Sequence, residues 1–186
     1  MIGEGGQEAF IAGAHKLIAT YYTMENPTAF DADAVEEHVE IEADDMLMRG
    51  FIDRIDVAPT GEIRVVDYKT GRSPPGEAYE AKALFQMKFY ALAILRTRGG
   101  AVPNRLQLMY LSDGQQLIYH PDHDELLRFE RTLRAIWQAI RTAVVSGGDF
   151  RPRKSRLCRF CEHQARCPEF GGEIPPYPGP PPGFVS

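Results

Sequence analysis

Two segments of alternating apolar and polar residues flank a Pro59-Thr60-Gly61 turn, and this pattern constrains the fold more than any other. Because strand side chains alternate between the faces of a sheet, each segment presents one mixed face. The residues on these faces are Phe51, Asp53, Ile55 and Val57, then Ile63, Val65, Asp67 and Lys69. A three-residue loop with Gly61 in the left-handed conformation would place Asp53 opposite Asp67. The sequence therefore predicts a hairpin with two carboxylates side by side.

The paired carboxylates indicate a metal site. Directly opposed acids repel each other, so a sequence that opposes them calls for a divalent cation. Hard oxygen ligands favour Mg2+ or Mn2+. Lys69, on the same face as Asp67, could orient a water molecule or stabilise charge on a phosphate. Judged by spacing alone, an exposed strand end with two unrelated acids and a surface lysine is an equal alternative.

The rest of the chain alternates between helical and strand patterns. Helices are expected over residues 7–22, 78–98 and 124–145, and further strands over 37–43, 105–111 and 115–119. This order predicts an α/β fold with a mixed central sheet flanked by helices. We expect one domain over residues 1–170 and a tail over 171–186, because six of the last sixteen residues are proline.

Charge and cysteine content limit the partners. The formal charge of −5 at pH 7 argues against a general polyanion binder. Six basic residues nevertheless gather between positions 151 and 166, as either a phosphate-facing patch or a solvated basic loop: Arg151, Arg153, Lys154, Arg156, Arg159 and Arg166. The three cysteines, Cys158, Cys161 and Cys167, are spaced for metal ligation more than for disulfides. Without a long apolar run or a signal-like start, a soluble cytoplasmic protein, away from membranes, is expected.

A family resemblance rests on three motifs in order. Gly50-Phe51-Ile52-Asp53-Arg54-Ile55-Asp56 and Val66-Asp67-Tyr68-Lys69-Thr70-Gly71 closely resemble the nuclease domain of the RecB family, which includes AddB-like nucleases and the exonucleases of CRISPR adaptation. Gln86 and Tyr90 resemble its Gln-x-x-x-Tyr motif, and Cys158-x2-Cys161-x5-Cys167 resembles three C-terminal ligands of its iron–sulfur cluster.

The resemblance implies a PD-(D/E)XK core, like that of restriction endonucleases, acting on DNA in repair or recombination. Asp53 and Asp67 would bind the catalytic Mg2+ or Mn2+, Lys69 would assist, and Gln86 and Tyr90 would line the site from one helix face. Exonuclease action is the family expectation, with a helicase or another repair subunit as a further partner.

The sequence departs from this family in two places. The family usually carries a metal-ligating His on an N-terminal helix, and only His15 offers a match. No Cys precedes Cys158, so the fourth thiolate of a four-iron cluster is absent, which suggests an N-terminal truncation. The cysteine site would then be empty or partial, or His163 would complete a Cys3His zinc site.

Two rival functions stay open. The chain could be a DNA-binding module in which the basic cysteine segment holds DNA and the acidic site is catalytically impaired. It could also be a small zinc-ribbon adaptor, although Asp67-Tyr68-Lys69 would then be a coincidence. Divalent-metal-dependent cleavage separates the nuclease from both.

Overall fold

The computed structural model describes residues 4–147, 150–181 and 184. Three α-helices and five strands make up most of them, with short 3-10 turns between and after. The elements follow the order α1 (Glu4–Met24), β1 (Ala34–Ala43), β2 (Met46–Val57), β3 (Ile63–Lys69), α2 (Glu77–Thr97), β4 (Arg105–Tyr110), β5 (Gln115–Tyr119) and α3 (His123–Val145). Each corresponds to an element that the sequence pattern predicts, with ends shifted by at most a few residues.

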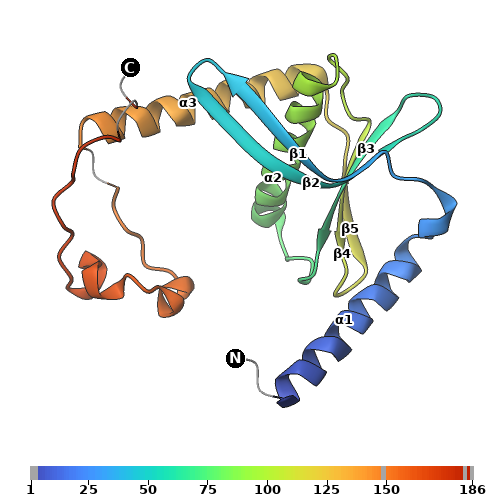
Figure 1. The fold of residues 1–186 in the computed structure, drawn as a ribbon, viewed down its shortest axis with the longest axis horizontal. Helices are drawn as coiled ribbons and strands as arrows, with labels where there is room; N and C mark the ends of the chain where they lie inside the picture. Colours follow the sequence, from blue (N-terminus) through green and yellow to red (C-terminus); the bar gives the residue numbers. More distant parts are fainter. Residues whose placement is uncertain (1–3, 148–149, 182–183, 185–186) are drawn as a thin grey trace. The chain divides into compact units, whose positions relative to one another are not determined.

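The five strands form one mixed sheet in the order β1-β2-β3-β4-β5 (Figure 1). Neighbouring strands run antiparallel except β3 and β4, which are parallel and are joined through α2. A parallel pair needs such a crossover because a tight turn cannot connect its ends. The sheet and its helices confirm the predicted α/β class.

The β2–β3 hairpin has the register that the sequence predicts. Val57 pairs with Ile63 and Ile55 pairs with Val65, and Gly61 in the connecting loop has a φ of 91°. Glycine tolerates this left-handed backbone without the steric cost of a Cβ atom. The register therefore directs Asp53 and Asp67 to the same face of the sheet.

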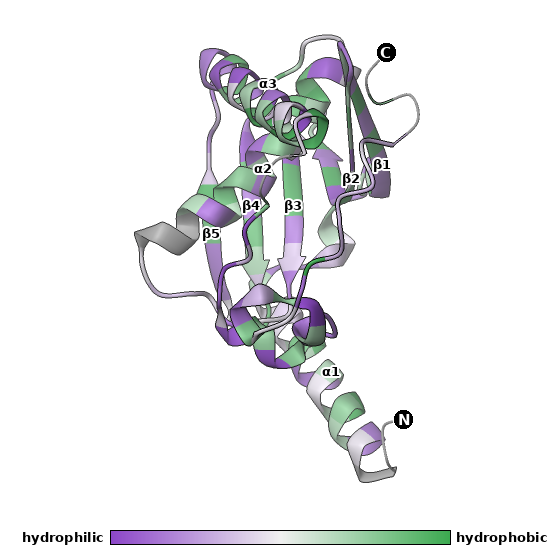
Figure 2. Cartoon of the chain, turned by 90° about the vertical axis from the view of Figure 1, so that its left-hand side faces the viewer, coloured by the Kyte–Doolittle hydropathy of each residue, from purple (hydrophilic) through white to green (hydrophobic). Residues whose placement is uncertain are grey.

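The core lies between this face and α2. Ile55, Val65 and Leu108 on the strands are at most 1% exposed, and so are Met87 and Leu92 on α2. Figure 2 shows hydrophobic residues along the middle of β3 and hydrophilic residues near its C-terminal end. The buried strand therefore ends in polar side chains, and this end carries Asp67 and Lys69.

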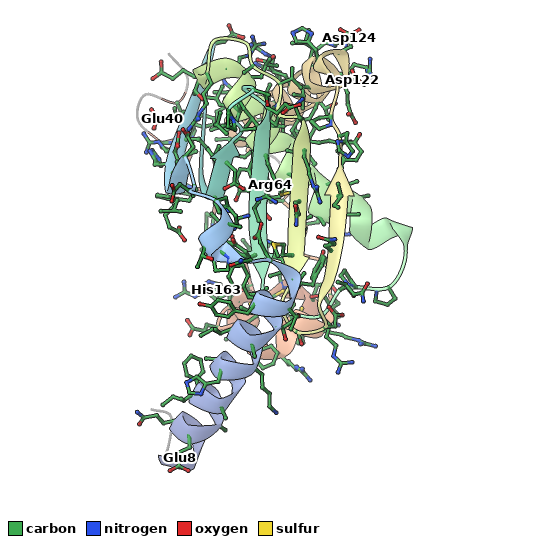
Figure 3. The ribbon with its side chains drawn as sticks, turned by 90° about the vertical axis from the view of Figure 1, so that its right-hand side faces the viewer. Glu8, Glu40, Arg64, Asp122, Asp124 and His163 are labelled. Carbon is green, nitrogen blue, oxygen red and sulfur yellow. The ribbon has the colours of Figure 1, made fainter. Side chains whose placement is uncertain are left out.

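The opposite face of the sheet is polar and is tied to the end of α1. Figure 3 looks onto this face, where Arg64 is labelled on β3. The Glu25 carboxylate, just after α1, accepts two hydrogen bonds from Arg54, at 2.9 and 3.0 Å, and one from Arg64, at 2.9 Å. This forked, largely buried arrangement holds β2, β3 and the end of α1 in a fixed geometry.

The chain divides into two compact units, Met1–Arg131 and Thr132–Ser186, and the division falls within α3. In the first unit, the Asp122 side chain accepts a 2.8 Å hydrogen bond from the Glu125 backbone at the start of α3, so Asp122 caps this helix.

The second unit contains three short 3-10 turns, η2 (Arg156–Phe160), η3 (Gln164–Arg166) and η4 (Pro168–Phe170). Its described tail has no helix or strand, but it is not a free end. The Tyr177 hydroxyl donates to the Val144 carbonyl at 2.9 Å, and the Phe184 ring packs edge-on against Trp137. Within the described residues, no helix is both long and apolar enough to span a membrane.

Candidate active site

Asp53 and Asp67 meet where β2 and β3 begin to separate. The last pair of the two strands is Arg54 with Val66, and the two acids, Asp53 and Asp67, are the next residues beyond this pair. Beyond it, the Asp53 carboxylate accepts a 2.8 Å hydrogen bond from the Tyr68 backbone N–H. The Asp53 side chain thus spans to the neighbouring strand and is fixed beside Asp67.

Asp67 is held almost completely out of water. It is 1% exposed, and its Oδ2 atom has no hydrogen-bond partner among the described residues. Lys69 Nζ lies 2.6 Å from this oxygen as an ion pair. Burial raises the pKa of Asp67, Lys69 counteracts the rise, and the nearby Asp53 adds to it. A carboxylate that is buried beside a second acid favours a nearby cation, because its negative charge is costly without one.

Lys69 is also connected to α2. Its ammonium donates to Gln86 Oε1 at 3.1 Å, and Gln86 Nε2 donates to the Tyr90 hydroxyl at 2.6 Å. Gln86 and Tyr90 are four residues apart and share a helix face, as the sequence predicts. The structure therefore brings Asp53, Asp67, Lys69, Gln86 and Tyr90 together.

Tyr90 stays protonated at this site. Burial raises its pKa, Gln86 lowers it, and the negative charges of Asp67, Asp53 and Glu36 raise it further. A protonated hydroxyl that already accepts from Gln86 still has its own hydrogen to donate. Tyr90 can therefore serve as a hydrogen-bond donor to an anionic group.

Glu36 is a third acid in this electrostatic environment, and sequence reasoning missed it. Val35 pairs with Arg54 and Glu37 with Ile52, so Glu36 on β1 falls opposite Asp53. Its backbone φ of 51° is left-handed, which is uncommon for a residue other than glycine. Counting the β1–β2 register back from the Asp44-Asp45 turn would have placed Glu36 opposite Asp53. The strand expected from the sequence began at residue 37, so Glu36 was left out.

His15 is not part of this cluster. It lies exposed on α1, and no hydrogen bond or ion pair among the described residues joins it to Asp53 or Asp67. His15 as a metal ligand therefore stays a prediction. Asp56 lies on the other face of β2 and pairs with Arg64 at 2.7 Å.

The cysteines lie in the second unit. Cys158 lies within η2, and Cys161 directly follows it. Cys167 directly precedes η4. All three are free thiols. The Cys158 sulfur accepts a hydrogen bond from the Ser155 backbone N–H at 3.3 Å. In the part of the chain that the structure describes, no group of three or more His, Cys, Asp or Glu side chains is arranged to hold a metal ion.

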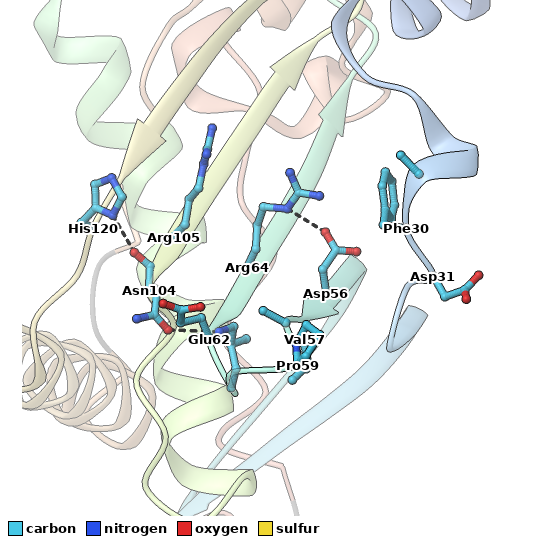
Figure 4. Close-up of a pocket in the computed structure, with 13 residues that line it drawn as sticks. Phe30, Asp31, Asp56, Val57, Pro59, Glu62, Arg64, Asn104, Arg105 and His120 are labelled. Atoms are coloured by element: carbon cyan, nitrogen blue, oxygen red, sulfur yellow. Dashed lines mark hydrogen bonds and ion pairs between the residues drawn. The ribbon is translucent and has the colours of Figure 1, made fainter.

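A cavity of about 800 Å3 lies elsewhere, on the polar face of the sheet (Figure 4). Phe30, Arg64, Arg105 and His120 contribute to its lining, and none of the five clustered residues does. Figure 4 shows Arg64 joined to Asp56, and His120 joined to the Asn104 backbone. Because Asp53 and Asp67 lie on the other face of the sheet, this cavity is not the candidate active site.

The cluster fits a divalent cation of the Mg2+ type. Asp53 and Asp67 supply hard carboxylate oxygens, and Asp67 Oδ2 lacks a hydrogen bond. Two protein carboxylates are enough for Mg2+, which usually keeps several waters and binds substrate phosphate. Lys69 and Tyr90 add donors beside these oxygens, so the site can bind a cation and an anionic oxygen together.

The chain is similar to two curated phage proteins. Gene 69 protein of Mycobacterium phage D29 is 31% identical over 140 residues, covering 74% of this chain and 48% of the phage protein. Gene 69 protein of Mycobacterium phage L5 is 33% identical over 140 residues, covering 74% and 45%. The chain thus spans about half the length of these curated relatives.

A solved structure described as "Crystal structure of SSO0001" is also similar. It has a TM-score of 0.46 and 17% identity, with 87% of this chain and 71% of that chain covered. The sequence profile of the PD-(D/E)XK nuclease superfamily matches residues 3–168, nearly the whole chain. With the sheet, the paired aspartates and the lysine in place, the chain belongs to the PD-(D/E)XK nuclease superfamily.

Proposed function

We propose that this chain hydrolyses phosphodiester bonds in DNA with Mg2+ or Mn2+ held by Asp53 and Asp67. The observation that carries the proposal is the connected row from Asp67 through Lys69 and Gln86 to Tyr90. This row joins a cation-binding carboxylate to donors for an anionic oxygen. Membership in a nuclease superfamily supports the same chemistry.

Each residue has a separate task in this proposal. The bound cation would supply Lewis-acid polarisation of a phosphate oxygen and lower the pKa of water. Asp53 and Asp67 hold it, with Asp53 fixed by the Tyr68 backbone. Lys69 presents an ammonium to the charge that develops on the phosphate, and Gln86 limits the directions in which Lys69 can point. Tyr90 donates its hydroxyl hydrogen to the DNA backbone.

The mode of action is the finer part of the proposal. We propose that the enzyme is an exonuclease acting on DNA ends in repair or recombination, in line with the RecB-like motifs. A helicase or another repair subunit would supply unwound DNA. The matched part of the phage relatives is about half of their length.

A labelled-DNA assay tests the enzyme and its mode together. The purified chain is incubated with end-labelled linear DNA and with closed circular DNA, in Mn2+, in Mg2+ or in EDTA. We expect linear DNA to be degraded only with a divalent cation, and circular DNA to persist. Cleavage of both forms would assign an endonuclease, and cleavage in EDTA would contradict the metal-dependent mechanism.

One observation favours a second candidate, a DNA-binding module with an impaired site. His15 is exposed on α1 and makes no hydrogen bond or ion pair with Asp53 or Asp67 among the described residues, so the histidine ligand of the RecB-like pattern stays a prediction. Such a module would bind DNA through the basic cysteine segment without cutting it. Retained DNA binding with no cleavage in Mn2+ or Mg2+ would identify this candidate.

A further inference from the structure

The turn η2 sorts its side chains into rows. A 3-10 helix has three residues per turn, so side chains three apart lie above one another. In η2 this places Arg156 above Arg159 and Leu157 above Phe160. A basic row therefore runs beside an apolar row on a single turn of chain.

The apolar row is open to solvent. Leu157 is 73% exposed and Phe160 is 71% exposed, although side chains of this kind are normally buried. The Arg159 guanidinium lies 4.6 Å from the centre of the Phe160 ring, over one of its faces. A guanidinium on one face leaves the rest of the ring available to a further flat partner.

The surrounding charge selects an anionic partner. The side chains of Arg153, Arg156 and Arg166 make no hydrogen bond or ion pair within the described residues. Lys154 is only loosely paired, 3.9 Å from Glu169, and it also lies over the Phe170 ring. Exposed aromatic rings among unpaired arginines match nucleic acid, whose bases stack on the rings while its phosphates attract the cations.

The turn is held in place without a large apolar core. The Ser155 hydroxyl caps η2 by accepting from the Leu157 N–H at 3.2 Å, and the Gln164 side chain donates to the Cys158 carbonyl. Gly172 packs against the backbone of residues 165–167, where a Cβ atom would lie 2.5 Å from the Ala165 carbonyl oxygen. A surface ordered before binding loses less entropy when its ligand arrives.

We propose that Arg156, Leu157, Arg159 and Phe160 form a stacking surface for single-stranded DNA, with a base on Phe160 and phosphates on the two arginines. A duplex keeps the faces of its internal bases stacked on each other, whereas a single strand exposes them. The inference rests on the proposed function for the choice of DNA as ligand. It adds that the ligand is recognised unpaired and through its bases.

Binding without cleavage tests the surface directly. Fluorescence anisotropy of the whole chain, with no added divalent cation, would compare labelled oligothymidylate, an abasic strand of equal length and a duplex. We expect oligothymidylate to bind most tightly. Phe160→Ala should weaken that binding about five- to 150-fold, while binding of the abasic strand changes little. Phe160→Trp should retain it.

Two variants test whether a flat ring at this position is what binds the base. Phe160→Leu keeps an apolar side chain without a flat ring, so stacking predicts that it fails like Phe160→Ala. Phe10→Ala removes a similarly exposed ring on α1 and should leave binding unchanged. Circular dichroism would check that each variant is folded.

Equal affinity for the abasic strand and oligothymidylate would overturn the stacking surface. Binding of oligothymidylate by Phe160→Leu as tightly as by the wild-type chain would overturn it as well. The stacking surface would also be overturned if the protein self-associates and Phe160→Ala abolishes this association, because Phe160 would then contact a second copy of the chain. The outcome is independent of catalysis, because loss of cleavage in an active-site variant tests the nuclease and leaves this binding measurement unaffected.

Discussion

Asp67 is a carboxylate that the fold keeps out of water before any substrate arrives. Its Oδ2 atom is buried without a hydrogen bond, and the ion pair with Lys69 compensates its charge only in part. A buried charge in this state is unfavourable unless a cation or a proton neutralises it. Proton and metal should therefore compete for Asp67.

This competition gives a pH dependence. Because burial raises the pKa of Asp67, its proton is lost only above the ordinary aspartate range of about 3.9. We expect Mn2+ affinity, measured by calorimetry, to fall on acidification, starting at a higher pH than an ordinary aspartate would give. An affinity that stays constant from neutral pH down to that ordinary range would contradict the assigned ligand.

Lys69 should act on the substrate and not on the metal. Lys69→Met keeps most of the aliphatic stem but removes the ammonium, so cleavage should fall at least about 100-fold, as when a single charge-stabilising donor is removed. Mn2+ binding by calorimetry should persist, because an ammonium does not ligate a hard cation. Lys16→Met, on α1, is the matched control. Loss of Mn2+ binding in Lys69→Met would show that the assigned role is wrong.

Part of the cluster could be predicted from regular spacing. Asp53, Asp67 and Lys69 obey the period of two of a strand. Gln86 and Tyr90 share a helix face, but only the resemblance to the RecB family implied that they line the site. Glu36 was missed because the expected strand began at residue 37, and its left-handed backbone also departs from the regular strand conformation. The position of His15 depends on how α1 lies, which its own sequence does not determine.

At the scale of elements, the site depends on how closely α2 approaches β2. The Phe89 and Tyr90 rings of α2 pack against Gly50 on β2, where a Cβ atom would be 2.8 Å from the Phe89 ring and 3.4 Å from the Tyr90 ring. A side chain there would push against the helix that carries Gln86 and Tyr90. The glycine thus keeps α2 within reach of Lys69.

Gly50→Ala should therefore destabilise the fold by about 1–3 kcal/mol, the usual cost of overpacking. Urea unfolding followed by circular dichroism would measure it. Gly13→Ala is the control, because nothing lies within 4 Å of a Cβ atom there, and alanine in a helix gains up to about 1 kcal/mol over glycine. Unchanged stability in Gly50→Ala would show that α2 does not depend on this close approach.

The cysteine segment gives a second prediction at this scale. A four-iron cluster normally takes four thiolates, and this chain has three cysteines. We expect anaerobically purified protein to contain fewer than about four irons per chain by elemental analysis. One bound zinc would support His163 as a fourth ligand. A stable brown protein with a complete cluster would show that a fourth ligand comes from elsewhere.

Long elements were predicted well, whereas the 3-10 turns were not. Helices and strands carry periodic apolar patterns over many residues, so β5 matches its expected bounds. η2, η3 and η4 are three to five residues long and are held by local hydrogen bonds such as Cys161 N–H to Cys158 carbonyl. No period can be recognised over such short lengths.

For the whole molecule, the α/β class and the mixed sheet were predicted correctly from the order of elements. The boundary between the two compact units was not foreseen, because it falls inside α3, where the helical pattern continues without interruption. A nuclease domain over residues 1–170, with a tail after it, stays a prediction. Limited proteolysis would locate the boundary of the stable core.

The most direct measurement of the central claim is DNA cleavage by Asp67→Asn. This change keeps the size of the buried side chain but removes the charge that would hold the cation. We expect the wild-type chain to degrade linear DNA in Mn2+, and Asp67→Asn, folded by circular dichroism, to leave it intact. Glu62→Gln, an exposed change in the same hairpin, should cleave normally. Cleavage by Asp67→Asn at the wild-type rate would contradict the assignment of this site.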